Sequence, residues 1–201
     1  YRNLNNLITK ISQNQKKYAA EIKSKQKQSK EIDRQINKLI AEAIAKSKKK
    51  KNGIGLTAEA QLISKNFNTN KGKLPWPVSK GYVVLRFGKQ PHPIVKTTTI
   101  QSNGVRIRTS SEIEARTIFD GLIYSIILSK NNTYTVLIQH GNFFTVYKNL
   151  SEIFISKGDK VKTKELLGKI STDVSTQQTI LSFSIFKDGV PQNPASWIYK
   201  M

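Results

Sequence analysis

The chain has 201 residues and a formal net charge of +21, because 34 Lys and Arg outnumber 13 Asp and Glu. This length suffices for one ordinary domain with an appendage, or for two small domains. The chain has no cysteine, which excludes disulfides and thiolate metal sites, and its two histidines make a histidine-built zinc site difficult. No apolar run approaches the roughly 18 residues that a membrane-spanning helix needs.

The positive charge is unevenly distributed along the chain. The first 51 residues carry 15 of the basic and 4 of the acidic residues, which is about half of the net charge. Lys outnumbers Arg by 28 to 6, whereas readers of nucleic-acid sequence favour the planar fork of Arg. We therefore expect no specific nucleic-acid partner, only weak attraction to anionic polymers or lipid headgroups. Because the chain starts at Tyr1 within a charged periodic pattern, we expect a fragment or a trimmed mature chain.

Residues 1–51 predict a helical arm. They contain no Gly and no Pro, and apolar residues recur mostly at steps of three and four from Leu4 to Ala43, the spacing of a coiled-coil seam. Lys25 and Ser29 occupy seam positions, so the middle of the seam is weak. A helix with one apolar stripe needs a partner. We expect a coiled-coil arm that docks on another protein, and a solvated spacer is the alternative.

Residues 52–74 predict a hinge followed by a short helix. Gly53 and Gly55 end a run of lysines, and Thr57 is a suitable N-cap for a helix over Ala58–Phe67. The apolar residues of this helix share one side and are Ala60, Leu62, Ile63 and Phe67. Because so short a helix is not stable alone, that side must lie against a neighbouring surface.

Residues 75–201 predict β structure. Runs of β-branched and aromatic residues alternate with turn signals such as Asp120-Gly121 and Asp188-Gly189. The predicted strands cover residues 82–87, 104–108, 114–119, 122–128, 133–139, 143–147 and 180–187. Regular spacing without a convincing long helix favours an antiparallel sheet or sandwich with one core. The predicted fold class is mostly β, preceded by the long coiled-coil helix and the short helix.

Short motifs in this β region keep a characteristic order. They are Trp76-Pro77-Val78, Arg86-Phe87-Gly88, Asn103-Gly104-Val105, Gln139-His140-Gly141, Tyr147-Lys148-Asn149-Leu150, Gly158-Asp159-Lys160-Val161 and Asn193-Pro194-Ala195-Ser196-Trp197. In order and spacing they resemble the LytM or lysostaphin-type peptidase domain over about residues 75–201. We expect Trp76 and Trp197 to close the ends of the core.

Active members of that family are zinc endopeptidases that cut peptidoglycan, and the resemblance implies where their functional residues would lie. The three ligand positions hold Ser102, Arg106 and Ser182, and the two catalytic histidine positions hold Asn149 and Ile180. Serine is a poor zinc ligand, and Arg carries a permanent positive charge. We therefore expect no zinc, no other cofactor and no peptidase activity. The remaining histidines, His92 and His140, fall outside the ligand positions and are expected to be structural.

A zinc-free domain of this type behind a coiled coil resembles the EnvC-type murein hydrolase activators. That resemblance implies a periplasmic protein whose arm docks on the inner-membrane ABC-transporter-like complex of cell division. It also implies that the vestigial groove binds and activates a cell-wall amidase, with peptidoglycan as a further possible partner. The expected groove residues are Ser102, Asn103, Arg106, Asn149, Ile180, Ser182 and Phe186. The short helix, through Leu62, Ile63 and Phe67, is expected to cover this groove as a restraint, and an ordinary linker helix is the alternative.

Three other functions stay open from the sequence. The first is an active zinc endopeptidase. The second is a periplasmic adaptor, since adaptors also join a helical hairpin to lipoyl-like motifs, although only one such half-motif, at Gly158-Asp159, is present. The third is a non-catalytic scaffold that binds peptidoglycan.

Overall fold

The computed structural model describes residues 24, 26–47, 57–91 and 99–201. The chain divides into two compact units, Tyr1–Lys38 and Leu39–Met201. The first described helix covers residues 26–47, a span of 22 residues. The rest of the predicted arm lies outside the described residues, so the coiled coil stays a prediction, as do the boundaries after residues 51 and 74. No helix in the described part is long and apolar enough to cross a membrane.

Local ion pairing accompanies the helix at residues 26–47. The Arg34 guanidinium donates to both carboxylate oxygens of Glu31, at 2.8 and 3.0 Å, and the Gln35 amide donates to Glu31 at 3.1 Å. Residues three and four apart are neighbours on a helix surface, and such exposed pairs stabilise it by about 0.2–0.5 kcal/mol each. The helical prediction is therefore confirmed for this part of the arm.

The second helix, α2 (Ala58–Thr69), begins at the predicted cap. The Thr57 hydroxyl accepts a hydrogen bond from the Ala60 amide at 3.2 Å, which satisfies one of the free N–H groups of the first turn. The helix ends two residues later than expected. Its C-cap, Asn70, donates from its side chain to the Asn66 carbonyl at 2.8 Å.

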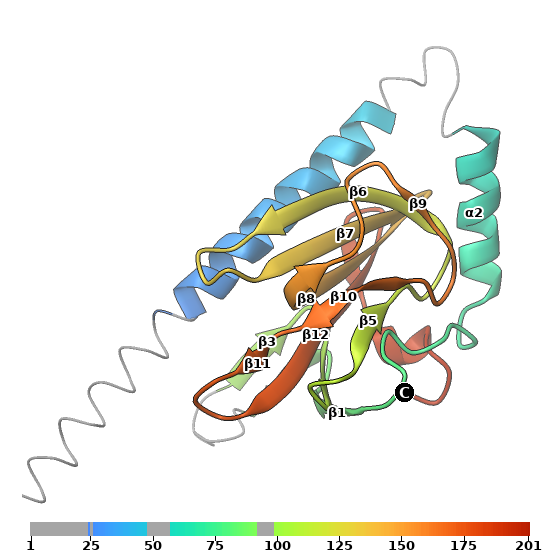
Figure 1. The fold of residues 1–201 in the computed structure, drawn as a ribbon. Coiled ribbons are helices and arrows are strands. Elements are labelled where there is room, and N and C mark those ends of the chain that lie inside the picture. Colours follow the sequence, from blue (N-terminus) through green and yellow to red (C-terminus); the bar gives the residue numbers. More distant parts are fainter. Residues whose placement is uncertain (1–23, 25, 48–56, 92–98) are drawn as a thin grey trace, which may run out of the picture. The chain divides into compact units, whose positions relative to one another are not determined.

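The strands form an antiparallel sheet of eleven strands within the described residues, beside a two-stranded hairpin of β2 and β3. The main path runs β1-β4-β12-β8-β7-β6-β9, β10 pairs with both β5 and β8, and β11 and β13 pair with β12 (Figure 1). The strands are β1 (Tyr82–Leu85), β2 (Gly88–Pro91), β3 (Thr99–Ser102), β4 (Val105–Thr109), β5 (Glu114–Arg116), β6 (Gly121–Leu128), β7 (Tyr134–His140), β8 (Phe143–Ile153), β9 (Lys160–Val161), β10 (Leu166–Ile170), β11 (Thr172–Asp173), β12 (Gln178–Lys187) and β13 (Val190–Gln192). Each predicted strand overlaps an observed one, so the mostly β fold is confirmed.

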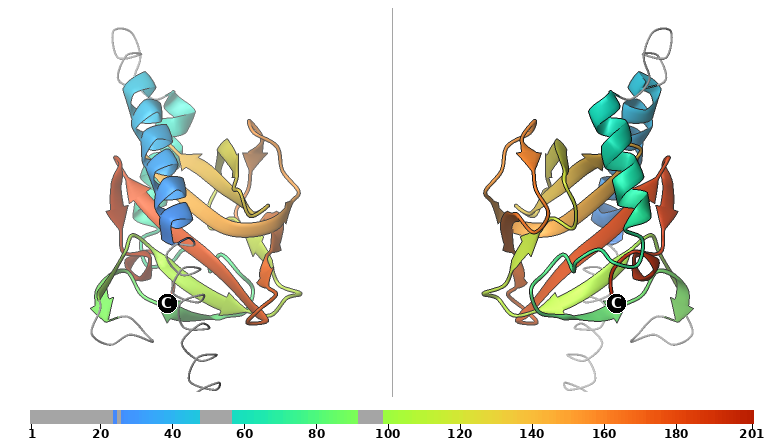
Figure 2. Two further views of the ribbon diagram at one scale, coloured as in Figure 1. Left: turned by 90° about the vertical axis from the view of Figure 1, so that its left-hand side faces the viewer. Right: turned by 90° about the vertical axis from the view of Figure 1, so that its right-hand side faces the viewer.

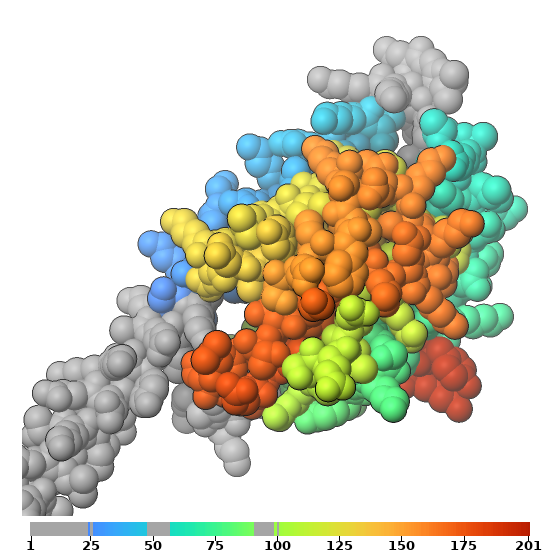
Figure 3. Space-filling view, viewed as in Figure 1, coloured from blue at the N-terminus to red at the C-terminus, as the bar shows by residue number. Residues whose placement is uncertain are grey.

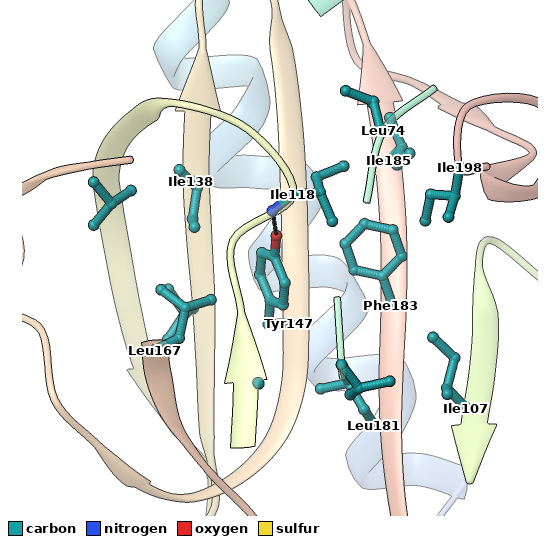
Figure 4. Packing of buried hydrophobic residues seen from close by; sticks show 14 of the residues in the cluster. Leu74, Ile107, Ile118, Ile138, Tyr147, Leu167, Leu181, Phe183, Ile185 and Ile198 are labelled. Atoms are coloured by element: carbon teal, nitrogen blue, oxygen red, sulfur yellow. Dashed lines mark hydrogen bonds between the residues drawn. The ribbon is translucent and has the colours of Figure 1, made fainter. Parts of the chain in front are cut away.

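The core lies on one face of the central strands, where alternate residues point inward. Figure 4 shows Leu181, Phe183 and Ile185 of β12 projecting into it together with Tyr147 of β8. The Tyr147 hydroxyl accepts a hydrogen bond from the buried Ile118 amide at 3.0 Å. Burial also raises the pKa of the Tyr147 phenol, so this group stays protonated and its polar end is satisfied inside an apolar core.

Helix α2 packs on the β domain through one aromatic side chain. Phe67 is fully buried, stacks on Phe143 with ring centroids 4.6 Å apart, and contacts His140, Phe119 and Trp197 at 5.1–5.4 Å. Figure 2 shows α2 alongside the sheet in both views. The aromatic contacts join residues distant in sequence, so α2 is part of the core.

Two polar contacts also hold α2, one with β9 and one with the β7–β8 turn. Glu59 forms an exposed ion pair with Lys160 at 2.8 Å, and the side chains of α2 adjoin the segment around β9 in Figure 3. The Ser64 hydroxyl donates to the side chain of Asn142. Gly141 has φ 71°, and a Cβ there would lie 2.4 Å from the Ala60 carbonyl oxygen. Only glycine allows the turn to approach the helix this closely.

The entry and exit of the β domain are joined to each other. Leu74 and Ile198 form a parallel bridge, and the amides of Gly72 and Leu74 both donate to the Trp197 carbonyl, at 2.9 and 3.2 Å. The Trp76 indole donates to the Tyr199 carbonyl at 2.9 Å. Trp197 is buried and Trp76 packs against the core, which confirms the expectation that both tryptophans close its ends.

Candidate functional site

The candidate site lies on the face of β4, β12 and β8 opposite the core. Val105 and Ile107 of β4 belong to the core, so the intervening Arg106 and Arg108 point to the other side. We call that side the outer face. On β12 it carries Ile180.

Strand register places the outer-face residues in two rows. In the first row Arg106, Ser182 and Lys148 are direct partners across β4, β12 and β8. In the second row Arg108 is paired with Ile180 on β12 and with Tyr82 on β1. Neighbouring strands lie about 4.8 Å apart and alternate residues of a strand about 6.7 Å apart, so these side chains form one compact patch. Three of the predicted positions, Arg106, Ile180 and Ser182, therefore come together.

Ser102 ends β3, and Asn103 lies in the turn between β3 and β4. The half-buried Ser102 hydroxyl donates to the Gly104 carbonyl at 2.9 Å and accepts from the Gly104 amide at 3.4 Å, whereas Asn103 is exposed. A Cβ at Gly104 would lie 2.2 Å from the Phe183 carbonyl oxygen. The hydrogen bonds of the Ser102 hydroxyl therefore stabilise the turn that precedes β4.

Asn149 has a structural role at the edge of the outer face. Its backbone has φ 77°, the left-handed region that asparagine tolerates better than most residues. Its amide donates to the carbonyls of Ile180 at 2.8 Å and Ser171 at 3.2 Å, and its own carbonyl accepts from the Ser171 amide at 2.8 Å. Asn149 therefore fastens β8 to β12 and to the segment between β10 and β11.

Phe186 lies on the same face of β12 but is not an open groove residue. It is paired with Phe144 and is only 4% exposed, and Ser184 and Val146 between it and the first row are also buried. The outer face therefore has a covered end around Phe186 and an open end around Arg106 and Ser182. This burial does not support the predicted groove contact of Phe186.

The histidines do not contribute to the outer face as far as the structure describes them. His140 is fully buried; its Nδ1 donates to the Asp120 carbonyl at 2.6 Å and its Nε2 accepts from the Thr145 hydroxyl at 2.8 Å. Burial lowers the pKa of His140 to about 4, although the Asp120 carbonyl opposes this shift. His140 is therefore a neutral structural side chain, as predicted, and His92 lies outside the described residues.

The residues present do not fit a zinc ion. In the described part of the chain, no group of three or more His, Cys, Asp and Glu is placed to hold a metal. At the inferred ligand positions, Ser182 is a poor donor, Arg106 is a permanent cation, and the Ser102 hydroxyl is bound to its own turn. What the outer face offers is positive charge, hydrogen-bond donors and a small apolar surface, which suit binding.

The predicted restraining residues have unequal surroundings. Phe67 is in the core, Ile63 is half-buried and Leu62 is 58% exposed. Two polar contacts of α2 are with Asn142 of the β7–β8 turn and Lys160 of β9, whereas Arg106 and Ser182 of the inferred ligand positions lie on β4 and β12. These contacts favour the alternative of a helix that belongs to the domain, and the restraint stays a prediction.

Sequence reasoning missed three residues of the patch, namely Tyr82, Arg108 and Lys148. The alternation Val105-Arg106-Ile107-Arg108 already placed both arginines on one side of a strand. Lys148 was not identified because the motif that contains it was interpreted only through Asn149. Tyr82 becomes a neighbour only through the β1–β4 pairing, which the sequence does not specify.

Comparison with known proteins shows what the β domain is similar to. The model of peptidase family M23 matches residues 101–194, just under half of the chain. Stage II sporulation protein Q of Bacillus subtilis (strain 168) is 36% identical over 70 residues, which are 33% of this chain and 25% of that protein. The chain therefore spans about a quarter of the length of this curated relative.

Solved structures support the same fold. The SpoIIQ–SpoIIIAH pore-forming complex has a chain that aligns with a TM-score of 0.52 and 22% identity, over 65% of this chain and 93% of that one. A zinc-containing peptidase from Vibrio cholerae aligns with a TM-score of 0.53 and 18% identity, over 64% and 41%. Residues 101–194 are thus similar to the M23 peptidase family, and the fold of the β domain is similar to that of these solved structures. The EnvC-type activator stays a prediction.

Proposed function

We propose that this chain is a non-catalytic activator of a cell-wall amidase, which it binds through the open end of the outer face. One observation carries the proposal. Arg106 and Ser182 are direct register partners where the resemblance puts two zinc ligands, and neither fits the metal. Because the surrounding sheet is fully built, the loss of metal chemistry leaves a shaped surface with charge and hydrogen-bond donors, which is what protein recognition needs.

The similarities support a role in protein assembly. SpoIIQ, the relative with 36% identity over 70 residues, forms a pore-forming complex with SpoIIIAH. An M23-type domain can therefore serve as one partner in a protein complex. The amidase itself is proposed from the sequence resemblance to EnvC-type activators, which also motivates a periplasmic location and an inner-membrane ABC-transporter-like partner for the helical arm.

The test compares amidase activation with peptidase activity. Purified full chain is added to a cell-wall amidase acting on dye-labelled peptidoglycan, and separately incubated with peptidoglycan and zinc without the amidase. We expect release of dye only with the amidase. Arg106→Glu and Ser182→Tyr should abolish activation while circular dichroism stays unchanged, and Lys157→Glu, exposed before β9 at the far end of the strand order, should activate normally. Unaltered activation by both outer-face variants would reject the assignment of the site.

Control by α2 needs a test that spares the core. Deleting Ala58–Phe67 would remove buried Phe67 and is uninformative. The double substitution Glu59→Lys and Ser64→Ala instead breaks the ion pair to Lys160 and the bond to Asn142. If α2 restrains the site, loosening it shifts the population toward the active form and raises basal activation. An unchanged basal level would assign α2 to the fold alone.

A peptidoglycan-binding or adaptor scaffold is the second candidate, supported by the net charge of +21, which attracts anionic polymers. Co-sedimentation with intact sacculi, with and without amidase, separates the two functions. Sedimentation without the amidase, combined with no effect on its activity, would favour the scaffold. Peptidoglycan cleavage that depends on added zinc would instead identify an active endopeptidase.

A further inference from the structure

Two arginines on the outer face have no partner in the described chain. Neither the Arg106 nor the Arg108 guanidinium makes a hydrogen bond or an ion pair with any residue that the structure describes. Two ion pairs of the β domain, between Lys160 and Glu59 and between Lys169 and Glu152, involve other residues. The sheet thus presents two fork-shaped donors that no residue in the described ranges neutralises through an ion pair.

The surroundings of the arginines are partly apolar. Arg108 lies between Tyr82, which is 56% exposed, and half-buried Ile180 in the register of β1, β4 and β12. Ser182, beside Arg106, adds a hydroxyl. Arginine binds carboxylates through two parallel hydrogen bonds, which makes it more selective than a lysine at the same place.

The spacing suits carboxylates on a helix. Arg106 and Arg108 are two residues apart on one strand, so their Cα atoms are separated by about 6.7 Å. Acidic side chains three or four residues apart on a helix begin about 5–6 Å apart. An aliphatic residue between them would face Tyr82 and Ile180.

We propose that the open end of the outer face binds an acidic segment of the partner protein, with carboxylates on Arg106 and Arg108 and an aliphatic side chain against Tyr82 and Ile180. This inference rests on the proposed function, because it names the chemistry of the partner at the same site. A protein segment fits better than a glycan, since the half-buried aliphatic side chain of Ile180 offers no hydrogen bond to a sugar.

The test uses a probe that does not require the amidase. A short fluorescein-labelled peptide carries two glutamates one helical turn apart with a leucine between them, and a second peptide replaces the glutamates by glutamines. Fluorescence anisotropy at physiological salt gives the affinity of each for the full chain. We expect the glutamate peptide to bind roughly tenfold more tightly, because charged pairs are lost with glutamine.

Variants then distinguish the site from general attraction to a basic protein. The double variant Arg106→Glu/Arg108→Glu should lose roughly tenfold or more in affinity for the glutamate peptide. The variant Arg106→Lys/Arg108→Lys keeps the charge but removes the fork, so an intermediate loss of about threefold is expected. Lys157→Glu controls for one reversed charge at the other end of the sheet, and Ile180→Asp tests the apolar contact.

The outcomes separate this inference from the proposed function. Equal binding of the two peptides, or equal loss in the Arg106/Arg108 and Lys157 variants, would overturn the acidic segment. Unlabelled oligothymidine, soluble glycan strands and glutamate peptide can each be added as competitors of the labelled peptide. If either polymer competes as strongly as the glutamate peptide, the acidic segment is rejected in favour of an anionic polymer. Selective peptide binding without amidase activation would uphold the inference and reject the amidase as the partner.

Discussion

Alternate residues of β12 face opposite sides of the sheet, and only those on one side form the core. Leu181, Phe183 and Ile185 are fully buried, whereas Ile180 and Ser182 on the other side are only partly covered. The buried set defines the sheet packing, so residues of the other set can differ without disturbing that packing. This difference explains how a fold similar to that of a zinc-containing peptidase can persist without residues that fit a metal.

The strongest test of this difference is to truncate two adjacent side chains of β12, one on each face. Phe183→Ala should lower the free energy of unfolding by about 3–5 kcal/mol, because it removes a buried aromatic ring and leaves a cavity. Ser182→Ala, one residue away on the outer face, should change it by less than about 0.5 kcal/mol. Urea unfolding of the full chain measures both, and similar losses would contradict the division into two faces.

The next largest effect concerns His140 on the buried side. The pKa of His140 in the folded chain is about 4, below the usual 6.5. Between pH 6.5 and 4 the imidazole is therefore protonated in the unfolded chain but neutral in the folded chain. The contribution of neutral His140 to the free energy of unfolding is therefore complete above pH 6.5. It decreases by about 3 kcal/mol as the pH falls toward 4. His140→Gln should reduce this slope. Parallel unfolding curves for both proteins across pH 4–7 would show that His140 is not responsible.

Substitutions of Asn149 test how its left-handed backbone and its side-chain hydrogen bonds contribute to the free energy of unfolding. Asn149→Gly keeps the left-handed backbone but loses the bonds to the Ile180 and Ser171 carbonyls, and should cost about 1–2 kcal/mol. Asn149→Ala should cost about 1 kcal/mol more, since alanine is strained at φ 77°. Chemical denaturation distinguishes them, and equal stabilities would mean that the backbone conformation is not under strain.

The smallest expected effect is on the open end itself. Arg106→Glu should leave the unfolding free energy within about 0.5 kcal/mol of the original chain, because the exposed guanidinium makes no hydrogen bond or ion pair with a described residue. A matched thermal scan of Lys157→Glu gives the effect of a charge change elsewhere. A large loss of stability in Arg106→Glu alone would make this arginine part of the fold rather than of a binding surface.

The fold was predictable because its signals are local. Runs of β-branched and aromatic residues at 104–108 and 180–187, together with the turns at Asp120-Gly121 and Asp188-Gly189, identified strands that the structure confirms. Thr57 likewise identified the start of α2. Such signals depend on neighbours in sequence, for which side-chain period and capping are reliable guides.

The site was predicted less completely because its composition depends on strand pairing. Arg106 and Ser182 were identified through motifs, but the neighbours Lys148 and Tyr82 follow from registers that no motif states. Phe186 was assigned to the groove from its position on β12, and its burial could not be known without tertiary structure. For Phe67, helical periodicity showed an apolar side but not which surface it meets.

The bridge between Leu74 and Ile198 has a consequence for how the protein is made. Phe67 stacks near Trp197, and both Gly72 and Leu74 donate to the Trp197 carbonyl. Residues at the start of the domain thus need residues at the end of the domain before their contacts exist. During synthesis the ribosome releases the N-terminal side first, so α2 must wait for the last strand and turn to emerge. Completion of this domain therefore has to follow the synthesis of Trp197 and Ile198.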